Sequence, residues 1–156
     1  MTNTDFDFLS GHWVSRQRRL VKALAGSDEW YEFDATLDCQ VLLDGDGVFD
    51  VLRAPERGIE GLTLRLFHPD EQVWRIWWAS KAGGGMLDVP VVGRFTDGTG
   101  TFECDDVWQG TPIRVRYVWS RTRTEHPRWE QAFSTDGGRT WEVNWVADFS
   151  RADGGR

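Results

Sequence analysis

The sequence contains no long apolar run, few cysteines and no clustered positive charge. No stretch of about 18 apolar residues occurs, which excludes a membrane-spanning helix. Residues 1–7 are polar and acidic and lack the basic and apolar regions of a secretory signal, so we expect a cytoplasmic protein. The 18 basic side chains are scattered and outnumbered by 25 acidic ones, giving a net charge of −7. This balance argues against a nucleic-acid partner, because phosphate backbones attract clustered positive charge.

Residues that bind metals or act as nucleophiles are equally sparse. Cys39 and Cys104 form no CxxC pair and have no histidine at zinc-site spacing, so we expect buried thiols. A disulfide or a reactive thiol is the alternative. The three histidines lie in separate regions and no GxSxG motif occurs. The sequence therefore predicts no metal site, no cofactor and no catalytic residue.

Aromatic residues are abundant instead, with ten Trp and nine Phe among 156 residues. This apolar surface is enough for a sizeable core, and the length fits a single domain over residues 1–156. Apolar and polar side chains alternate at period two, most clearly over 62–66 and 113–119, and turn residues recur about every ten positions. The pattern predicts about ten antiparallel strands, starting near Gly11, Trp30, Gly47, Gly61, Gln72, Val91, Gly100, Pro112, Arg128 and Trp141.

Ten consecutive strands with short connections form an up-and-down meander, and such a meander closes into an all-β barrel because closure removes both exposed edges. Alternate connections then lie at the same end. We expect the tight turns to form a floor: 43–46, 68–71 and 97–99. We expect the longer loops to surround a mouth: 21–28, 54–60, 81–90 and 106–111. Three glycines at 83–85 make loop 81–90 either a mobile flap or a passive linker.

Strand parity predicts which side chains line the barrel. An apolar, mainly aromatic wall with few polar groups is typical of a small-molecule pocket. The residues that we expect to bind such a molecule are Tyr31, Trp74, Trp78, Tyr117, Trp119, Gln131 and Trp145. The alternative is a barrel filled by its own side chains.

Parity makes further predictions about the two faces of the strands. It turns Leu62, Leu64 and Leu66 inward, as well as Trp141 and Val143 beside Trp145. It turns three acids of the second strand outward toward the arginines of the first strand: Glu32, Asp34 and Asp38. With the opposite parity these acids would be buried acid–base candidates. Four residues are expected to form an exterior patch suited to a protein partner or a homodimer: Arg65, Phe67, Arg75 and Trp77.

The segment Ser134-Thr135-Asp136-Gly137-Gly138-Arg139-Thr140-Trp141 resembles the Asp-box of sialidases and related β-proteins. In those proteins the Ser and Asp side chains bond the turn backbone and the Trp packs beneath the hairpin, away from the catalytic site. The resemblance implies structural roles for Ser134, Asp136 and Trp141.

The segment Gly11-His12-Trp13, following Phe6-Asp7-Phe8-Leu9, resembles the G-x-W signature of the lipocalin or calycin superfamily. Together with the strand pattern and the segments 130–133 and 144–145, it makes nearly the whole chain similar to small bacterial lipocalin-like proteins of unknown function. The resemblance implies a barrel with a cavity and a structural Trp13 at the floor, crossed by Arg128 or Arg151. One branch of the family binds haem through a histidine; the loop position of His126 argues against haem here.

Three functions follow as hypotheses. The leading one is the binding of a small apolar or aromatic molecule in the cavity, without catalysis. The second is a cofactor-independent isomerase or cyclase, in which the same pocket shapes the substrate and Tyr117 or Gln131 polarises it. The third is a protein-interaction module that uses the barrel exterior. The first two require a cavity of roughly a few hundred Å³, and the third does not.

Overall fold

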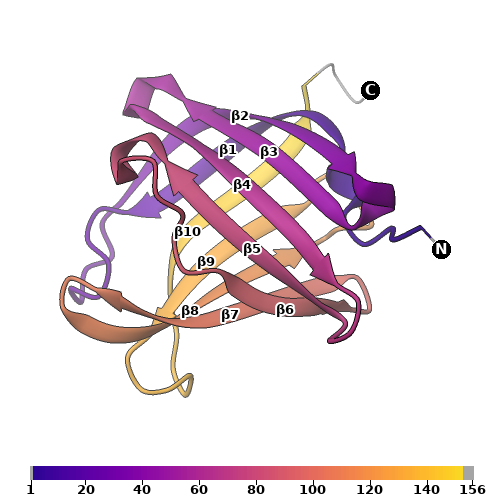
Figure 1. Ribbon diagram of the computed structural model, residues 1–156. Helices are drawn as coiled ribbons and strands as arrows, with labels where there is room; N and C mark the ends of the chain where they lie inside the picture. The colour runs from indigo at the N-terminus through magenta and orange to yellow at the C-terminus, as the bar shows by residue number, and fades with distance from the viewer. Residues whose placement is uncertain (1, 153–156) are drawn as a thin grey trace.

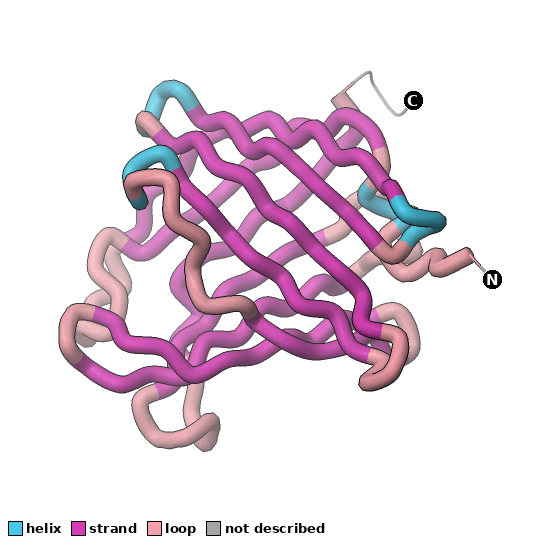
Figure 2. Tube along the Cα trace, viewed as in Figure 1, coloured by secondary structure: helices cyan, strands magenta, loops and turns pink. Residues whose placement is uncertain are grey.

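The computed structural model of the protein describes residues 2–152, which form a closed barrel of ten antiparallel strands (Figures 1 and 2). Consecutive strands are neighbours, and pairing of the first strand with the last closes the ring. The predicted barrel is confirmed, and each predicted strand start lies within two residues of the observed one. The strands are β1 (Gly11–Leu20), β2 (Trp30–Leu42), β3 (Gly47–Ala54), β4 (Ile59–His68), β5 (Val73–Ser80), β6 (Val91–Thr96), β7 (Thr99–Trp108), β8 (Thr111–Ser120), β9 (Arg128–Ser134) and β10 (Glu142–Arg151).

The connections fall at the two ends as the meander predicts. The floor, at the right in Figure 1, holds the turns after β2, β4 and β6, together with the longer segment 121–127. The mouth, at the left, holds the connections after β1, β3, β5, β7 and β9. A short 3-10 helix, η1 (Asp7–Leu9), precedes β1, and others occur in connections: η2 (Leu43–Gly45), η3 (Pro55–Arg57) and η4 (Lys81–Gly83).

The segment around η1 fills the floor with aromatic rings. Phe6 is 1% exposed and lies edge-to-face against Trp74 and Phe95, with ring centroids 4.8 and 4.9 Å away. The indole Nε1 of Trp13 donates a 2.8 Å hydrogen bond to the carbonyl of Leu9. These contacts close one end of the barrel with an aromatic core, because such rings bury large apolar areas.

An arginine of the last strand stacks on the Trp13 ring. The guanidinium carbon of Arg151 lies 3.9 Å from the centroid of the Trp13 ring, and its Nη1 donates to the carbonyl of Ser10. Arg128, the other candidate, instead forms a 2.7 Å ion pair with Asp148. Trp13 is therefore a buried floor residue, and the guanidinium that crosses it comes from Arg151.

Strand β4 has the opposite parity from the one predicted. Leu62 and Leu66 are 43% and 36% exposed, whereas Arg65 is 4% exposed inside the barrel. The register pairs Asp50 with Thr63 and Val48 with Arg65, which turns the odd positions of β4 inward. A shift of one residue would reverse every side chain of the strand, so the pairing with β3 decides the face.

A β-bulge in β10 corrects the prediction for two more residues. The register shifts between Val143 and Trp145, so Val143 pairs with Ala132 and does not reach the lumen. Trp141 also lies outside: Arg116 stacks on its ring at 4.1 Å. Its Nε1 donates to the carbonyl of Gly138 within the β9–β10 turn.

The β9–β10 turn is held by its own polar side chains. The Ser134 hydroxyl accepts from the backbone N–H of Gly138 at 2.9 Å, and Asp136 accepts from the N–H of Thr140 at 2.9 Å. The hydroxyl and N–H of Thr140, together with Ser134, hold the pKa of Asp136 well below its usual range. No residue of this turn lines the cavity described below, so these bonds are structural.

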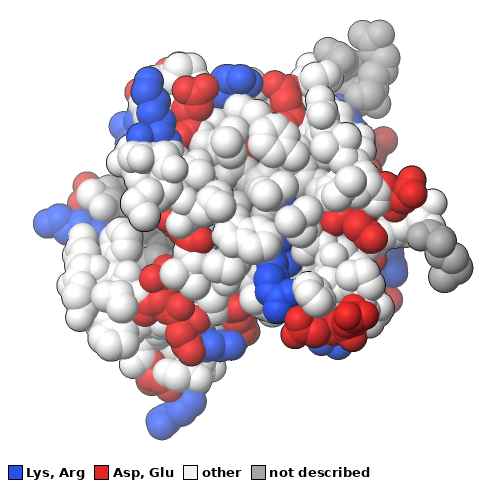
Figure 3. All heavy atoms as spheres, in the orientation of Figure 1, with Lys and Arg blue, Asp and Glu red and all other residues white. Residues whose placement is uncertain are grey.

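The outer surface carries the predicted charge ladder and an apolar face. Arg16 pairs with Glu32 and Asp34 at 3.3 and 3.1 Å, and Asp38 pairs with Arg53, so these acids are not buried. The predicted exterior patch is only partly correct, because Arg65 is buried and Phe67 packs on Trp74 at 5.3 Å. The sheet exterior instead presents an outer apolar face, over which Figure 3 shows few charged side chains. Its residues are Phe49, Val51, Leu62, Leu64, Leu66 and Trp77.

Candidate functional site

The mouth half of the barrel is hollow. A cavity of about 650 Å³ extends inward from the mouth, within the range of roughly 300–1,000 Å³ that small-molecule sites occupy. Its wall draws on all ten strands and on the loops after β1, β5 and β7. The barrel is therefore plugged at the floor and open above it.

A chain of aromatic rings forms one side of the wall. Trp145 meets Trp129 and Trp78 edge-to-face at 5.4 and 6.5 Å, and Tyr117 meets Trp129 at 5.1 Å. The Nε1 of Trp145 donates a 2.7 Å hydrogen bond to the amide oxygen of Gln17, which is 2% exposed. A ring whose N–H is already bonded stays in place and offers an apolar surface to a ligand.

A glycine makes room for one of these rings. A Cβ atom at Gly61 on β4 would lie 2.2 Å from Cη2 of Trp78, closer than any real Cβ contact. The indole of Trp78 therefore rests against the bare backbone of β4, which keeps it clear of the cavity centre.

Six of the seven predicted ligand-binding residues line the cavity: Tyr31, Trp78, Tyr117, Trp119, Gln131 and Trp145. Trp74 does not. Its side chain is fully buried in the floor, where its Nε1 donates to Asp5 at 2.9 Å. Trp108 also lines the cavity and was missed, although the alternation of Cys104, Asp106 and Trp108 along one strand placed them on one face.

The deepest polar feature of the wall is an ion pair that sequence parity missed. Nη1 of Arg65 lies 2.7 Å from Oδ2 of Asp50, and the two side chains are 4% and 1% exposed. The guanidinium carbon also lies 5.1 Å from the Phe6 ring centroid. Burial raises the pKa of the Asp50 carboxyl, and the positive charge of Arg65 opposes that rise. The sequence signal for this pair is an acid and a base on adjacent strands, but only the register of β3 with β4 turns both inward.

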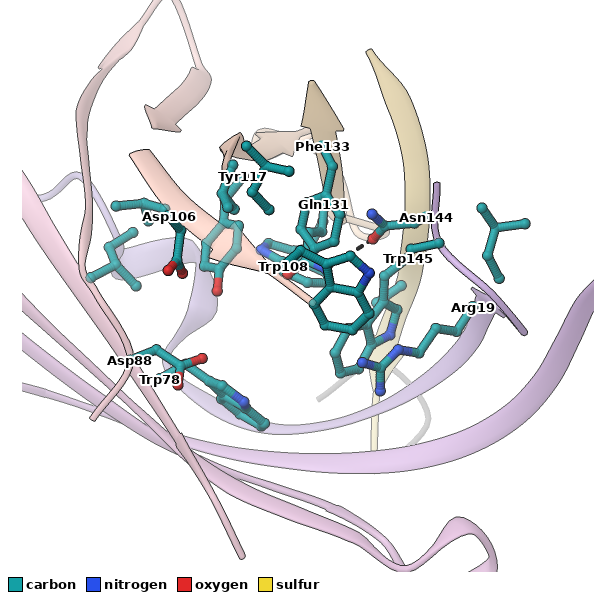
Figure 4. A pocket seen from close by; sticks show the side chains of 18 of the residues that line it. Arg19, Trp78, Asp88, Asp106, Trp108, Tyr117, Gln131, Phe133, Asn144 and Trp145 are labelled. Carbon is teal, nitrogen blue, oxygen red and sulfur yellow. Dashed lines mark hydrogen bonds between the residues drawn. The ribbon is translucent and has the colours of Figure 1, made fainter. Parts of the chain in front are cut away.

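Two acids lie on the wall near the mouth (Figure 4). Asp88 belongs to the loop between β5 and β6, and its backbone N–H donates to the carbonyl of Trp78 at 2.8 Å. Asp106 belongs to β7. Burial, followed by the charge of Asp106, raises the pKa of Asp88. Burial, followed by the charge of Asp88, raises the pKa of Tyr117, so its phenol stays protonated and is a hydrogen-bond donor.

Hydrogen-bond donors lie on the other side of the cavity. Gln131 donates from Nε2 to Oδ1 of Asn144 at 2.8 Å, while Nδ2 of Asn144 has no partner. Asn144 is 3% exposed and lines the cavity. Arg19 stacks on Trp145 at 4.1 Å on the same side, away from Asp88 and Asp106 (Figure 4).

The cysteines and histidines supply no reactive group. Neither thiol is bridged, and burial is the main reason that the pKa of Cys39 is about 12 and that of Cys104 about 11. Both thiols are therefore protonated near neutral pH. His126 contacts the carbonyl of Phe149 at the floor rather than the cavity. Within residues 2–152, no three His, Cys, Asp or Glu side chains are grouped as metal ligands.

Comparison with known proteins finds neither a matching family model nor a matching curated protein. Within the described part of the chain, no helix has the length and apolar character needed to cross a membrane. The function of the cavity is therefore argued from its geometry.

Proposed function

We propose that the protein binds a small apolar or aromatic molecule in the barrel cavity and does not transform it. The observation that carries the proposal is a hollow of about 650 Å³ beside four aromatic rings in mutual contact. Rings held by their neighbours bind a flat ligand without first having to be ordered, which lowers the entropic cost of binding. The few polar groups of the wall would then fix the orientation of the ligand.

The test uses a neutral, environment-sensitive dye, N-phenyl-1-naphthylamine. We expect one dye per chain, with quenching of tryptophan fluorescence, because the dye would lie against the indoles of the wall. Trp78→Ala is expected to weaken binding about tenfold by removing one wall of the site. Trp77→Ala is the matched control, because Trp77 lies on the outer apolar face, and it should leave the affinity unchanged. Absence of dye binding by the folded native protein would refute the proposal.

A cofactor-independent isomerase or cyclase is the second candidate, because it uses the same cavity. The protonated phenol of Tyr117 beside the aromatic wall favours it, since a positioned donor can polarise a carbonyl or an alkene. Slow conversion of a bound ligand that is lost in Tyr117→Phe, with binding retained, would distinguish this candidate from simple binding.

The exterior supports the third candidate, an interaction module or homodimer. The outer apolar face exposes Leu62 and Leu66 and includes Trp77. Exposed apolar patches of this kind often mark protein contacts. Sedimentation of the native chain and of Leu62→Asp would detect a dimer formed through this face.

A further inference from the structure

We propose that the ligand carries a cationic amine, which lies between Asp88 and Asp106 on one side of the cavity. The inference rests on the proposed binding function and specifies the chemistry of the ligand. It predicts an aromatic or apolar body with an ammonium group at one end and a hydrogen-bond acceptor toward the other.

The two carboxylates line the cavity without a basic partner in the described chain. Within residues 2–152, neither Asp88 nor Asp106 forms an ion pair with a Lys or Arg side chain. On β7 itself, the outward acids Glu103 and Asp105 both pair with Arg114, at 2.7 and 2.9 Å. The inward acid of the same strand thus lacks the countercharge that its outward neighbours have.

The two acids also repel each other, Asp88 from an exposed position at the mouth and Asp106 from a half-buried one. Asp106 adds to the effect of burial in raising the pKa of Asp88. A cation placed between them would remove this repulsion and form two charge-assisted contacts. A neutral or anionic group at the same place would gain nothing or be repelled.

Aromatic faces stand beside the acids. In Figure 4, Asp88 lies next to Trp78 and Asp106 lies near Tyr117, and Trp108 lines the same cavity. Electron-rich ring faces attract alkylammonium groups, and the attraction increases where water is excluded. Carboxylates and aromatic rings together favour an amine over a hydrated metal ion.

A separate observation indicates what the other end of the ligand carries. Asn144 is only 3% exposed. Its Oδ1 accepts a hydrogen bond from Gln131, whereas its Nδ2 has no acceptor among the described residues. A buried donor without an acceptor is destabilising, and an acceptor on the ligand would satisfy it. Arg19 lies on this side as well, so the ammonium group is expected at the opposite, acidic side (Figure 4).

The test compares three probes of the same shape by titration calorimetry at pH 7.5 and low salt. They are 2-(1-naphthyl)ethylamine, which is cationic, 2-(1-naphthyl)ethanol, which is neutral, and 1-naphthaleneacetate, which is anionic. We expect the amine to bind about tenfold more tightly than the alcohol, and the acetate to bind more weakly than either. A methoxy oxygen on the ring of the amine should tighten binding about fivefold in the native protein and not in Asn144→Leu.

Variants of the acids separate the cation site from general binding. Asp88→Asn and Asp106→Asn should each reduce the advantage of the amine over the alcohol, measured as the ratio of the two dissociation constants. Asp105→Asn is the matched control, because it removes the neighbouring charge on the outer face. Circular dichroism checks that each variant is folded.

The two proposals fail in different ways. Equal affinity for the amine and the alcohol, or an equal effect of Asp105→Asn and Asp106→Asn, would overturn the cation site while leaving the cavity as a binding site. If none of the three probes bound to the folded native protein, the proposed binding function itself would be refuted.

Discussion

The ion pair between Asp50 and Arg65 predicts an unequal response to the loss of either partner. The side chain of Arg65 is 4% exposed, so in Asp50→Val its guanidinium remains buried without a partner. An arginine cannot lose its charge. Removing one partner of a buried pair costs about 3–5 kcal/mol. With roughly 2–4 °C lost per kcal/mol in a chain of this size, we expect the melting temperature to fall by roughly 6–20 °C.

Arg65→Met should cost less, because the carboxyl of Asp50 can take up a proton. Its pKa is already raised in the folded protein and rises further without Arg65. A folded-state pKa above the unfolded value of 3.8 means that the folded form holds its proton longer. The contribution of Asp50 to the stability of Arg65→Met is therefore fully present below pH 3.8 and is lost as the pH rises through the folded pKa. The double variant Asp50→Val/Arg65→Met should recover most of the stability lost in Asp50→Val.

Urea unfolding followed by tryptophan fluorescence measures all four proteins in a double-mutant cycle. The expected coupling between Asp50 and Arg65 is about 2 kcal/mol or more. A coupling below about 0.5 kcal/mol would contradict the reasoning, because it would mean that water in the cavity solvates Arg65 after Asp50 is lost.

Three further predictions concern the wall, the β9–β10 turn and the thiols. Gly61→Ala should push the Trp78 indole into the cavity and weaken dye binding. An unchanged affinity for the dye would mean that the ring moves elsewhere. Asp136→Asn should remove stability that is present above pH 3.8 and lost as the pH falls through the lower folded pKa. Acid unfolding curves of the two proteins should thus converge at low pH, and a constant difference would contradict the role of the carboxylate. Cys104 has a pKa of about 11, so at pH 8 it should react with a disulfide reagent at about a thousandth of the rate of its thiolate. Because Cys104 lines the cavity, a bound ligand should slow this reaction further.

The barrel was predictable because each strand carries a local signal. Alternation over residues 113–119 and turn residues such as Asp97-Gly98 depend on neighbours in the chain, and both predicted the strands closely. The face of β4 was not predictable in this way. Leu62, Leu64 and Leu66 alternate as a core strand does, yet the register with β3 turns them outward. Alternation identifies a strand, whereas the pairing with its neighbour decides which side is buried.

The cavity wall was predicted better than its polar groups. Large rings such as Trp78 and Trp145 face inward from strands whose parity is clear. Asp88 lies in a loop without periodicity, and Asn144 reaches the lumen only through the bulge in β10. Both positions depend on long-range packing, so alternation alone carries no information about them.

The pairing of β1 with β10 also has a consequence for synthesis on the ribosome. Trp13 pairs with Arg151, so the edge of β1 that faces β10 stays uncovered until residue 151 has been synthesised. Contacts between such distant residues form slowly, and an uncovered strand edge invites association with other nascent chains. A chain stopped before residue 142 is expected to need a chaperone, and addition of a synthetic peptide of residues 142–151 should restore its solubility.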